Sequence, residues 1–326
     1  MLEKKLKNLI CPVTNLKFKI KIFKKKNDRV IDGIIISKNK DWYKIEDTIL
    51  DFTNVDEHNY KSYESFKKKY KIKLKLKKKK ELESINFQKN FFNHNTHKYE
   101  KEITKSPFSE TFDSYYLKQF IRKFKGKSII NIGGGSAREA LYFAKKNIEV
   151  TIVDVSVNIL KLAKKKFIKN KLYKNVNLIC GYAEKLNIKD KTFDGWIVYG
   201  AAHHFHNPKK SFLEAIRVTR KNGQFLIWEP SDTPLRKIFD ITMKLYCLWE
   251  EEDHVDFLFN QNFFKKTLKN KSTNLKTKNI ILLPPHLYYI NSYFVRRLLI
   301  LIDKVICSLP FFTKLGGTVL ISGNTK

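Results

Sequence analysis

One segment constrains the fold more than any other part of this 326-residue chain: residues 128–154, with the sequence SIINIGGGSAREALYFAKKNIEVTIVD. Its pattern predicts a buried strand at 128–132, a glycine turn at 133–135, an amphipathic helix at 138–146 and a second strand at 149–153. In such a βαβ unit the helix N-terminus meets the polar groups of a nucleotide. Asp154 lies 21 residues beyond Gly133, near the ~20-residue spacing at which a carboxylate meets ribose hydroxyls. The segment therefore predicts an α/β nucleotide-binding domain.

The spacing of small residues in the turn distinguishes between two classes of nucleotide. A dinucleotide fold carries G-x-G-x-x-G/A, and its third small position is Arg138 here, which is too large for the close helix–strand contact. The small residues fall instead at Gly133, Gly135 and Ala137. This spacing resembles the first motif of class I S-adenosylmethionine (SAM)-dependent methyltransferases.

Two further stretches are similar to the same family. Residues 178–194, LICGYAEKLNIKDKTFD, resemble its third strand and adenine loop, although Tyr182 stands where relatives often have the Asp that bonds the adenine amine. Residues 195–230 resemble its fourth strand, loop, helix and fifth strand. The resemblance covers roughly residues 98–229, and the subgroup it resembles most is the one that includes quinone-ring and small-molecule methyltransferases.

The resemblance implies an α/β fold, with a Rossmann-like seven-stranded mixed sheet, helices on both faces, and SAM as the cofactor. It implies that the glycine loop faces the methionine part of SAM and that Asp154 binds the ribose. The residues expected at the cofactor are Tyr99, Asn131, Gly133, Gly134, Gly135, Asp154, Val155, Ala183 and Glu184. A core or surface role for Tyr99 stays open.

Catalytic residues are indicated only weakly, because the methyl group of SAM is already electrophilic and alignment supplies most of the acceleration. His203 or His204, in the loop after the fourth strand, is the candidate base for a phenol or enol proton. The pair could instead shape the loop. His206 and His254 are weaker candidates. No fourth ligand accompanies the three clustered histidines, so no metal site is expected.

Missing motifs narrow the methyl acceptor. The loop YGAAHH at 199–204 lacks both the D/N-P-P-Y of base-amine methylation and the Cys of carbon-5 pyrimidine methylation. The expected acceptor is a small or lipid-linked molecule, methylated on oxygen or carbon. Two alternatives stay open. Asn131 and Tyr182 suggest a SAM-binding partner or sensor without turnover, and the Lys-rich segment suggests an RNA methyltransferase.

The net charge of +33 has two explanations. Only 8 of the 65 basic residues are Arg, and the codons for Lys are AT-rich. An AT-rich genome therefore explains the charge, and contact with nucleic acid or an anionic membrane explains it equally. The four cysteines are scattered, and the first residues lack an apolar signal-peptide core. We therefore expect a cytoplasmic protein, with peripheral attachment to the inner face of the membrane as an open option.

Composition divides the chain into three parts. Residues 1–56 are β-rich, and the runs LICPVTNLKF and WYKIEDTILDF resemble a zinc-ribbon-like module in which Cys11 lacks its partner, so it is expected to be metal-free. Residues 57–92 are a Lys-rich linker, solvated or touching anionic phosphates, with a candidate edge strand at 72–76. Residues 93–326 are the methyltransferase domain.

The last part carries an apolar insert at about 284–316, between the two final strands. A long connection in a compact domain is usually functional when it is ordered. Three roles stay open: a wall of the substrate pocket, a helix packed on the sheet, or a surface that lies on a membrane with Arg296, Arg297 and Lys304 at the headgroups.

Overall fold

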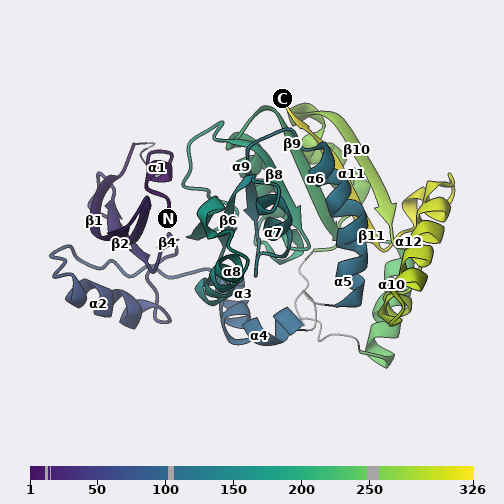
Figure 1. The fold of residues 1–326 in the computed structure, drawn as a ribbon, viewed down its shortest axis with the longest axis horizontal. Coiled ribbons are helices and arrows are strands. Elements are labelled where there is room, and N and C mark those ends of the chain that lie inside the picture. Colours follow the sequence, from purple (N-terminus) through teal and green to yellow (C-terminus); the bar gives the residue numbers. More distant parts are fainter. Residues whose placement is uncertain (12–13, 15, 102–105, 248–256) are drawn as a thin grey trace.

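The computed structural model describes residues 1–11, 14, 16–101, 106–247 and 257–326 (Figure 1). One mixed sheet of eleven strands runs through this part of the chain, in the order β1-β2-β3-β4-β7-β6-β5-β8-β9-β11-β10. Its second half consists of β5 (Ser128–Ile132), β6 (Glu149–Asp154), β7 (Val176–Cys180), β8 (Phe193–Tyr199), β9 (Thr219–Pro230), β10 (Ser272–Ile280) and β11 (Thr318–Thr325). These seven strands are the sheet that the sequence predicts for the methyltransferase domain.

The expected total of seven strands is wrong, because the N-terminal strands extend the same sheet. These strands are β1 (Lys19–Lys26), β2 (Arg29–Ile36), β3 (Trp42–Glu46) and β4 (Ile49–Asp51). β4 pairs in parallel with β7, with Leu50 opposite Ile179 and Asp51 opposite Cys180. Without β4, strand β7 would present a row of unpaired backbone groups. The N-terminal strands therefore cover what would otherwise be an edge.

Helices cover both faces of the sheet, as predicted. The central strands are apolar throughout because they are buried on both sides; all five residues of β5 are buried. α7 (Arg138–Ala144) and α8 (Val157–Lys169) bury Phe143 and Phe167 against one face. α9 (Pro208–Arg217) and α11 (Gln261–Leu268) bury Phe212 and Phe264 against the other.

The predicted linker holds two helices and no strand at 72–76. α2 (Tyr60–Lys69) packs Tyr63 and Phe66 on the N-terminal strands, and Ile72 buries itself in the same cluster instead of pairing at an edge. α3 (Glu83–His94) then crosses to the second half of the sheet. It is followed by α4 (Thr96–Tyr99), α5 (Pro107–Phe112) and α6 (Lys118–Lys123).

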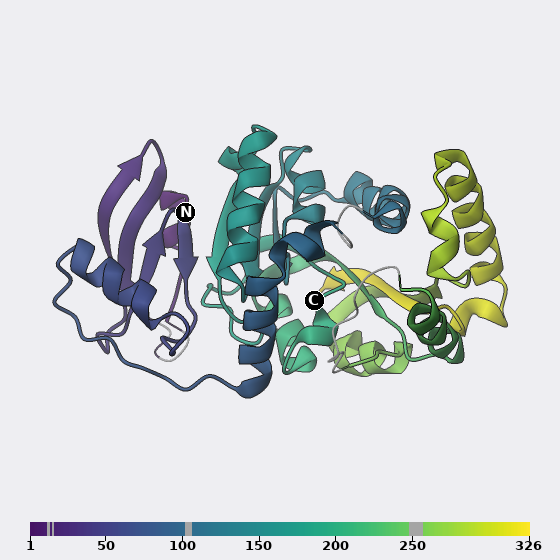
Figure 2. The same cartoon turned by 90° about the horizontal axis from the view of Figure 1, so that it is seen from below.

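Two more helices leave the carboxyl edge of the sheet. α10 (Pro234–Leu245) follows β9, and α12 (Tyr293–Ser308) lies in the insert between β10 and β11. Both β9 and β10 are antiparallel to β11, so their carboxyl ends meet at one edge. Figures 1 and 2 show α10 and α12 at the end of the molecule farthest from the N-terminal strands. In the described part of the chain no helix has the length and apolarity needed to span a bilayer.

Candidate functional site

An open pocket of about 680 Å³ lies where β5, β6, β7 and β8 end. Carboxyl ends of parallel strands are the usual ligand site of such sheets. Its lining comprises Ile85, Gln88, Phe92, Gly133, Gly135, Val153, Asp154, Val155, Ile159, Gly181, Tyr182, Ala183, Glu184, Gly200, Ala201, His204, Phe205 and His206. The pocket therefore brings together most of the predicted cofactor residues with one helix, α3, that the sequence did not implicate.

The glycine loop forms the floor of the pocket. Gly133 has φ +66°, and a Cβ there would lie 2.5 Å from the Cβ of Ala201, so only glycine fits. Gly135 has φ +48° and also lines the pocket. Gly134 does not: a Cβ there would lie 2.7 Å from a methyl of Ile152, so this glycine permits packing beneath the loop.

Asp154 stands at the end of β6 with its carboxylate in the pocket wall. The N–H groups of Gly135 and Ser156 donate to it at 2.9 and 3.0 Å. Burial raises its pKa to about 6, against those two hydrogen bonds. A carboxylate offers about four lone-pair sites, so acceptor capacity remains for ribose hydroxyls. The site therefore fits an adenosyl ligand.

Arg138 occupies the third small position of a dinucleotide motif, and its side chain makes polar contacts there. Its guanidinium donates to Glu139 and to Ser109, both at 2.7 Å, and approaches Asp113 to 3.3 Å. Burial raises the pKa of Asp113 to about 6, while the charge of Arg138 lowers it. Arg138 thus fastens α5 over the start of α7.

Helix α3 forms the wall opposite the glycine loop. Ile85, Gln88 and Phe92 project from it into the pocket. Gln88 is 4% exposed, and neither its amide oxygen nor its amide nitrogen has a hydrogen-bond partner among the described residues. Sequence reasoning missed this wall, because α3 lies mostly inside the segment predicted to be a linker.

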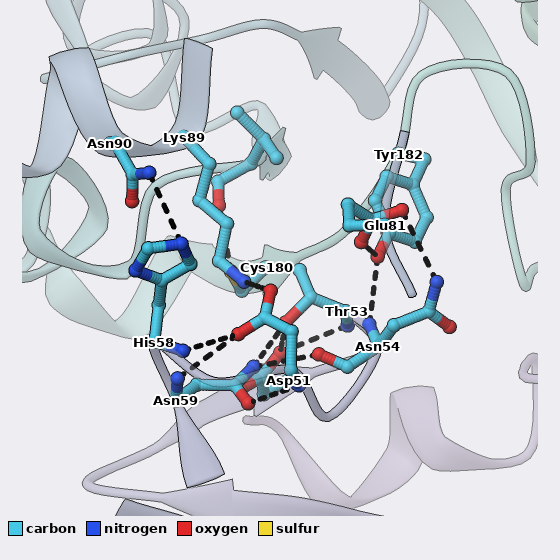
Figure 3. Close-up of polar contacts among 12 residues, drawn as sticks. Asp51, Thr53, Asn54, His58, Asn59, Glu81, Lys89, Asn90, Cys180 and Tyr182 are labelled. Atoms are coloured by element: carbon cyan, nitrogen blue, oxygen red, sulfur yellow. Dashed lines mark hydrogen bonds and ion pairs between the residues drawn. The ribbon is translucent and has the colours of Figure 1, made fainter. Parts of the chain in front are cut away.

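The segment after β4 holds α3 and the loop after β7 in place, and Figure 3 shows several of the residues involved. Lys89 and Asp56 form a buried ion pair at 2.6 Å, with side chains 5% and 7% exposed. The Tyr182 hydroxyl donates to Glu81 and accepts from the N–H of Asn54 at 2.7 Å. Tyr182, which replaces the adenine-binding Asp of relatives, therefore uses its hydroxyl to bind the segment before α3.

Glu229, at the end of β9, organises the loop after β8. It is fully buried and accepts from the N–H groups of Ala201 and Ala202 at 2.9 and 2.8 Å. Its Oε2 lies 2.7 Å from Nδ1 of His203. Burial raises the pKa of Glu229 to about 7 and lowers that of His203 to about 3. The imidazole of His203 is therefore neutral and turned toward Glu229.

His204, the other candidate base, lines the pocket. Its ring meets Phe92 edge-on at 5.6 Å between centroids. Burial lowers its pKa below the usual value. His206 also lines the pocket, with Nδ1 2.9 Å from the Ser84 hydroxyl. Of the predicted pair, His204 is thus the one that lines this pocket.

The remaining predicted residues divide into two groups. Val155, Ala183 and Glu184 line the pocket. Asn131 lies beneath it, 1% exposed, and its amide donates to Glu139 at 3.4 Å. Tyr99 ends α4, but its side chain and all of His254 lie outside the described residues. Those residues contain no group of three His, Cys, Asp or Glu placed to hold a metal ion.

Comparison with known proteins finds methyltransferases similar to part of the chain. Residues 130–227 match the family model described as a methyltransferase domain. The ubiquinone/menaquinone biosynthesis C-methyltransferase UbiE of Rickettsia bellii is 28% identical over 151 residues, which are 40% of this chain and 61% of that protein. UbiE of Rickettsia massiliae is 32% identical over 119 residues, 34% of this chain and 48% of that protein. The chain thus spans about half to three-fifths of these curated relatives.

A solved structure supports the fold independently. Phosphoethanolamine N-methyltransferase 2 of Haemonchus contortus, in complex with S-adenosyl-L-methionine, superposes with a TM-score of 0.55 at 17% identity. The match covers 77% of this chain and 62% of that one. Together with the match of residues 130–227 to the methyltransferase-domain model, it supports a SAM-dependent methyltransferase fold for this part of the chain.

Proposed function

We propose that the protein transfers the methyl group of SAM to an oxygen or carbon atom of a small or lipid-linked acceptor. The observation that carries this proposal is the pocket itself, in which a glycine loop at positive φ faces a strand-terminal carboxylate. UbiE proteins are named for C-methylation in quinone biosynthesis, which favours a carbon acceptor.

The residues of the chain have distinct tasks in this transfer. SAM supplies an electrophilic methyl group, so the protein mainly has to hold it in line with the acceptor. Asp154 accepts from the ribose hydroxyls, while the loop at 133–135 keeps side chains away from the methionine part. Glu229 fixes the loop after β8, which presents His204 to the pocket. His204, neutral because it is buried, is the proposed proton acceptor.

Radiolabelled SAM tests the proposal. The purified protein is incubated with methyl-labelled SAM and an extract of cells, which is then separated into lipid, aqueous and RNA fractions. Label in the lipid or small-molecule fraction that disappears with Asp154→Ala supports the proposal. Label in the RNA fraction, or SAM binding without any transferred label, contradicts it and favours an RNA enzyme or a non-catalytic partner.

A further inference from the structure

Helix α12 is apolar on two opposite sides, but only one of them packs against the protein. Ile300 and Cys307 are buried against the domain. Another set, three to four residues apart and therefore on one stripe of the helix, is exposed: Phe294, Leu298, Leu301, Ile302 and Val305. Phe294 is 77% exposed and Val305 63%. A helix that is apolar around most of its circumference is normally covered on both sides.

The apolar surface continues beyond α12. Leu309 and Phe311 follow the helix and are exposed, Phe311 by 76%. At the same end of the molecule, α10 exposes Ile238, Ile241 and Leu245, again at helical spacing (Figure 2). Exposed apolar patches larger than a few hundred Å² are unusual in soluble monomers and mark interaction sites.

The charges around this surface are positive. On α10 and α12 the exposed charged side chains are Lys237, Lys244, Arg297 and Lys304. Asp240 is paired with Arg236 at 2.6 Å, and Asp303 is buried, where it accepts from the backbone after β10. Arg297 and Lys304 lie seven residues, about two turns, apart on one border of the α12 stripe.

Arg296 corrects one expectation. One of the three open roles of the insert placed Arg296 with Arg297 and Lys304 at lipid headgroups, but Arg296 is 6% exposed and pairs with Glu110 at 2.9 Å. Its second bond, to the Thr111 hydroxyl at 3.1 Å, fastens α12 to α5. Arg296 therefore holds the helix to the domain, which leaves Arg297 and Lys304 as the cations beside the apolar stripe.

We propose that α12, together with α10, docks on an anionic lipid bilayer, with the apolar stripe in the headgroup–acyl boundary and the four cations at anionic headgroups. An apolar face bordered by Lys and Arg is the combination that binds such surfaces. A second copy of the chain fits less well, since a two-fold contact would gather like charges with no exposed acid on either helix to pair them. The docked edge is the one that holds the cofactor pocket.

Vesicle co-sedimentation tests this proposal and does not depend on methyl transfer. The full chain is expected to sediment with phosphatidylglycerol-containing vesicles at least about tenfold more than with phosphatidylcholine vesicles, and less at high salt. The double variant Phe294→Ser/Val305→Ser removes binding to both. The double variant Arg297→Gln/Lys304→Gln keeps binding to both vesicles and reduces the preference for anionic lipid, because Lys237 and Lys244 remain. Ile168→Ser, at a 52% exposed residue of α8, is the matched control and binds as wild type.

Two results would overturn the docking proposal. One is equal sedimentation of the wild type and the Phe294→Ser/Val305→Ser variant. The other is a dimer in solution, without vesicle binding, that this variant converts to a monomer; the stripe would then be an interface between copies. Circular dichroism of every variant establishes that loss of binding is not loss of folding.

A second inference comes from Gln88 and rests on the proposed function. The pocket needs a partner for the adenine amine, because the hydroxyl of Tyr182 is already occupied by Glu81 and Asn54. Gln88 lines the same pocket, and both polar atoms of its buried amide are unpartnered within the described chain. A glutamine amide can accept from the adenine amine and donate to a neighbouring ring nitrogen. We infer that Gln88 recognises the adenine of the cofactor.

Calorimetry with two ligands tests this role. Gln88→Met keeps the length of the side chain and removes both polar atoms. We expect it to weaken binding of S-adenosylhomocysteine and of 5′-methylthioadenosine by the same factor, about tenfold or more. Because the amide is unpaired in the free protein, the same variant should unfold at an equal or higher temperature than the wild type.

The outcomes distinguish failure of the adenine assignment from failure of the proposed function. Unchanged affinity in Gln88→Met, or a loss confined to S-adenosylhomocysteine, contradicts the adenine assignment while leaving the proposed function intact. Failure of the wild type to bind either ligand contradicts the proposed function itself. Asn90→Met, on the same helix but half-buried and outside the pocket lining, is the control and should bind as wild type.

Discussion

Replacing Lys89 with methionine should destabilise the protein strongly, because it leaves a buried carboxylate without its counterion. Lys89 and Asp56 lie 2.6 Å apart, and both side chains are less than a tenth exposed. Burial raises the pKa of Asp56, but the hydrogen bond and charge of Lys89 outweigh burial, so the net pKa is lowered. The remaining bonds to Asp56, from the N–H groups of His58 and Asn59 at 3.0 and 3.1 Å, both reach Oδ1. In Lys89→Met, the Oδ2 atom of Asp56 would lose the hydrogen bond that Lys89 donates to it.

The magnitude follows from that geometry. Removing one partner of a buried ion pair costs about 3–5 kcal/mol, whereas replacing both partners costs far less. Lys89→Met should therefore lower the free energy of unfolding by about 3 kcal/mol or more, and the double variant Asp56→Asn/Lys89→Met should recover a large part of it. Since Lys89 is next to Gln88 on α3, the single variant should also weaken binding in the cofactor pocket.

Urea unfolding of the wild type, both single variants and the double variant measures the coupling directly. The exposed pair Lys68–Glu64, at 3.8 Å, is the control, and Lys68→Met should change stability by less than about 0.5 kcal/mol. The reasoning fails if Lys89→Met costs no more than Lys68→Met, or if the double variant is as unstable as the sum of its singles.

Three further predictions concern the pocket and its buried carboxylates. Gly133→Ala should weaken S-adenosylhomocysteine binding by at least about tenfold in calorimetry, because its Cβ overlaps the loop after β8. Gly200→Ala has φ +63° and meets only the Trp228 ring at 4.0 Å, an ordinary contact, so it should lower stability by left-handed strain of about 1–2 kcal/mol. Burial raises the pKa of Asp113 to about 6, so its carboxyl stays protonated in the native state where the unfolded chain has lost the proton, and its contribution to stability should fall by about 1 kcal/mol from pH 5 to 8. Because the lowered pKa values of His203 and His204 shift total stability the other way, the contribution is read as the difference in urea midpoint between the wild type and Asp113→Asn, and a difference that is independent of pH refutes it. Because the pKa of Asp154 is also raised to about 6, ligand affinity should drop below about pH 6, and a pH-independent titration would contradict its role.

Local patterns made much of the domain predictable. The βαβ unit is decided by residues close together in sequence, and β5 has the predicted bounds. The helix after it ends at Ala144 instead of Lys146, because Asn147 takes φ +57° and turns the chain. Asp154 was found from its spacing to Gly133, since both positions follow adjacent parallel strands.

Long-range pairings were beyond the reach of sequence patterns. Leu50 pairs with Ile179, more than a hundred residues later in the sequence, and neither strand has a sequence feature that identifies its partner strand. The buried ion pair of Asp56 and Lys89 was equally unpredictable, because each residue lies in a polar segment whose sequence is typical of a solvent-exposed loop or linker. Sequence reasoning missed Gln88 for the same reason, since only the folded structure brings α3 and the glycine loop to the same pocket.

Binding of S-adenosylhomocysteine, measured by calorimetry, tests the central claim most directly. We predict saturable binding of one molecule per chain by the wild type. Asp154→Ala should weaken it by about ten- to hundredfold, from the loss of up to two charge-assisted hydrogen bonds. The account is contradicted if the wild type shows no binding, if NAD binds as well, or if Asp154→Ala leaves the affinity unchanged.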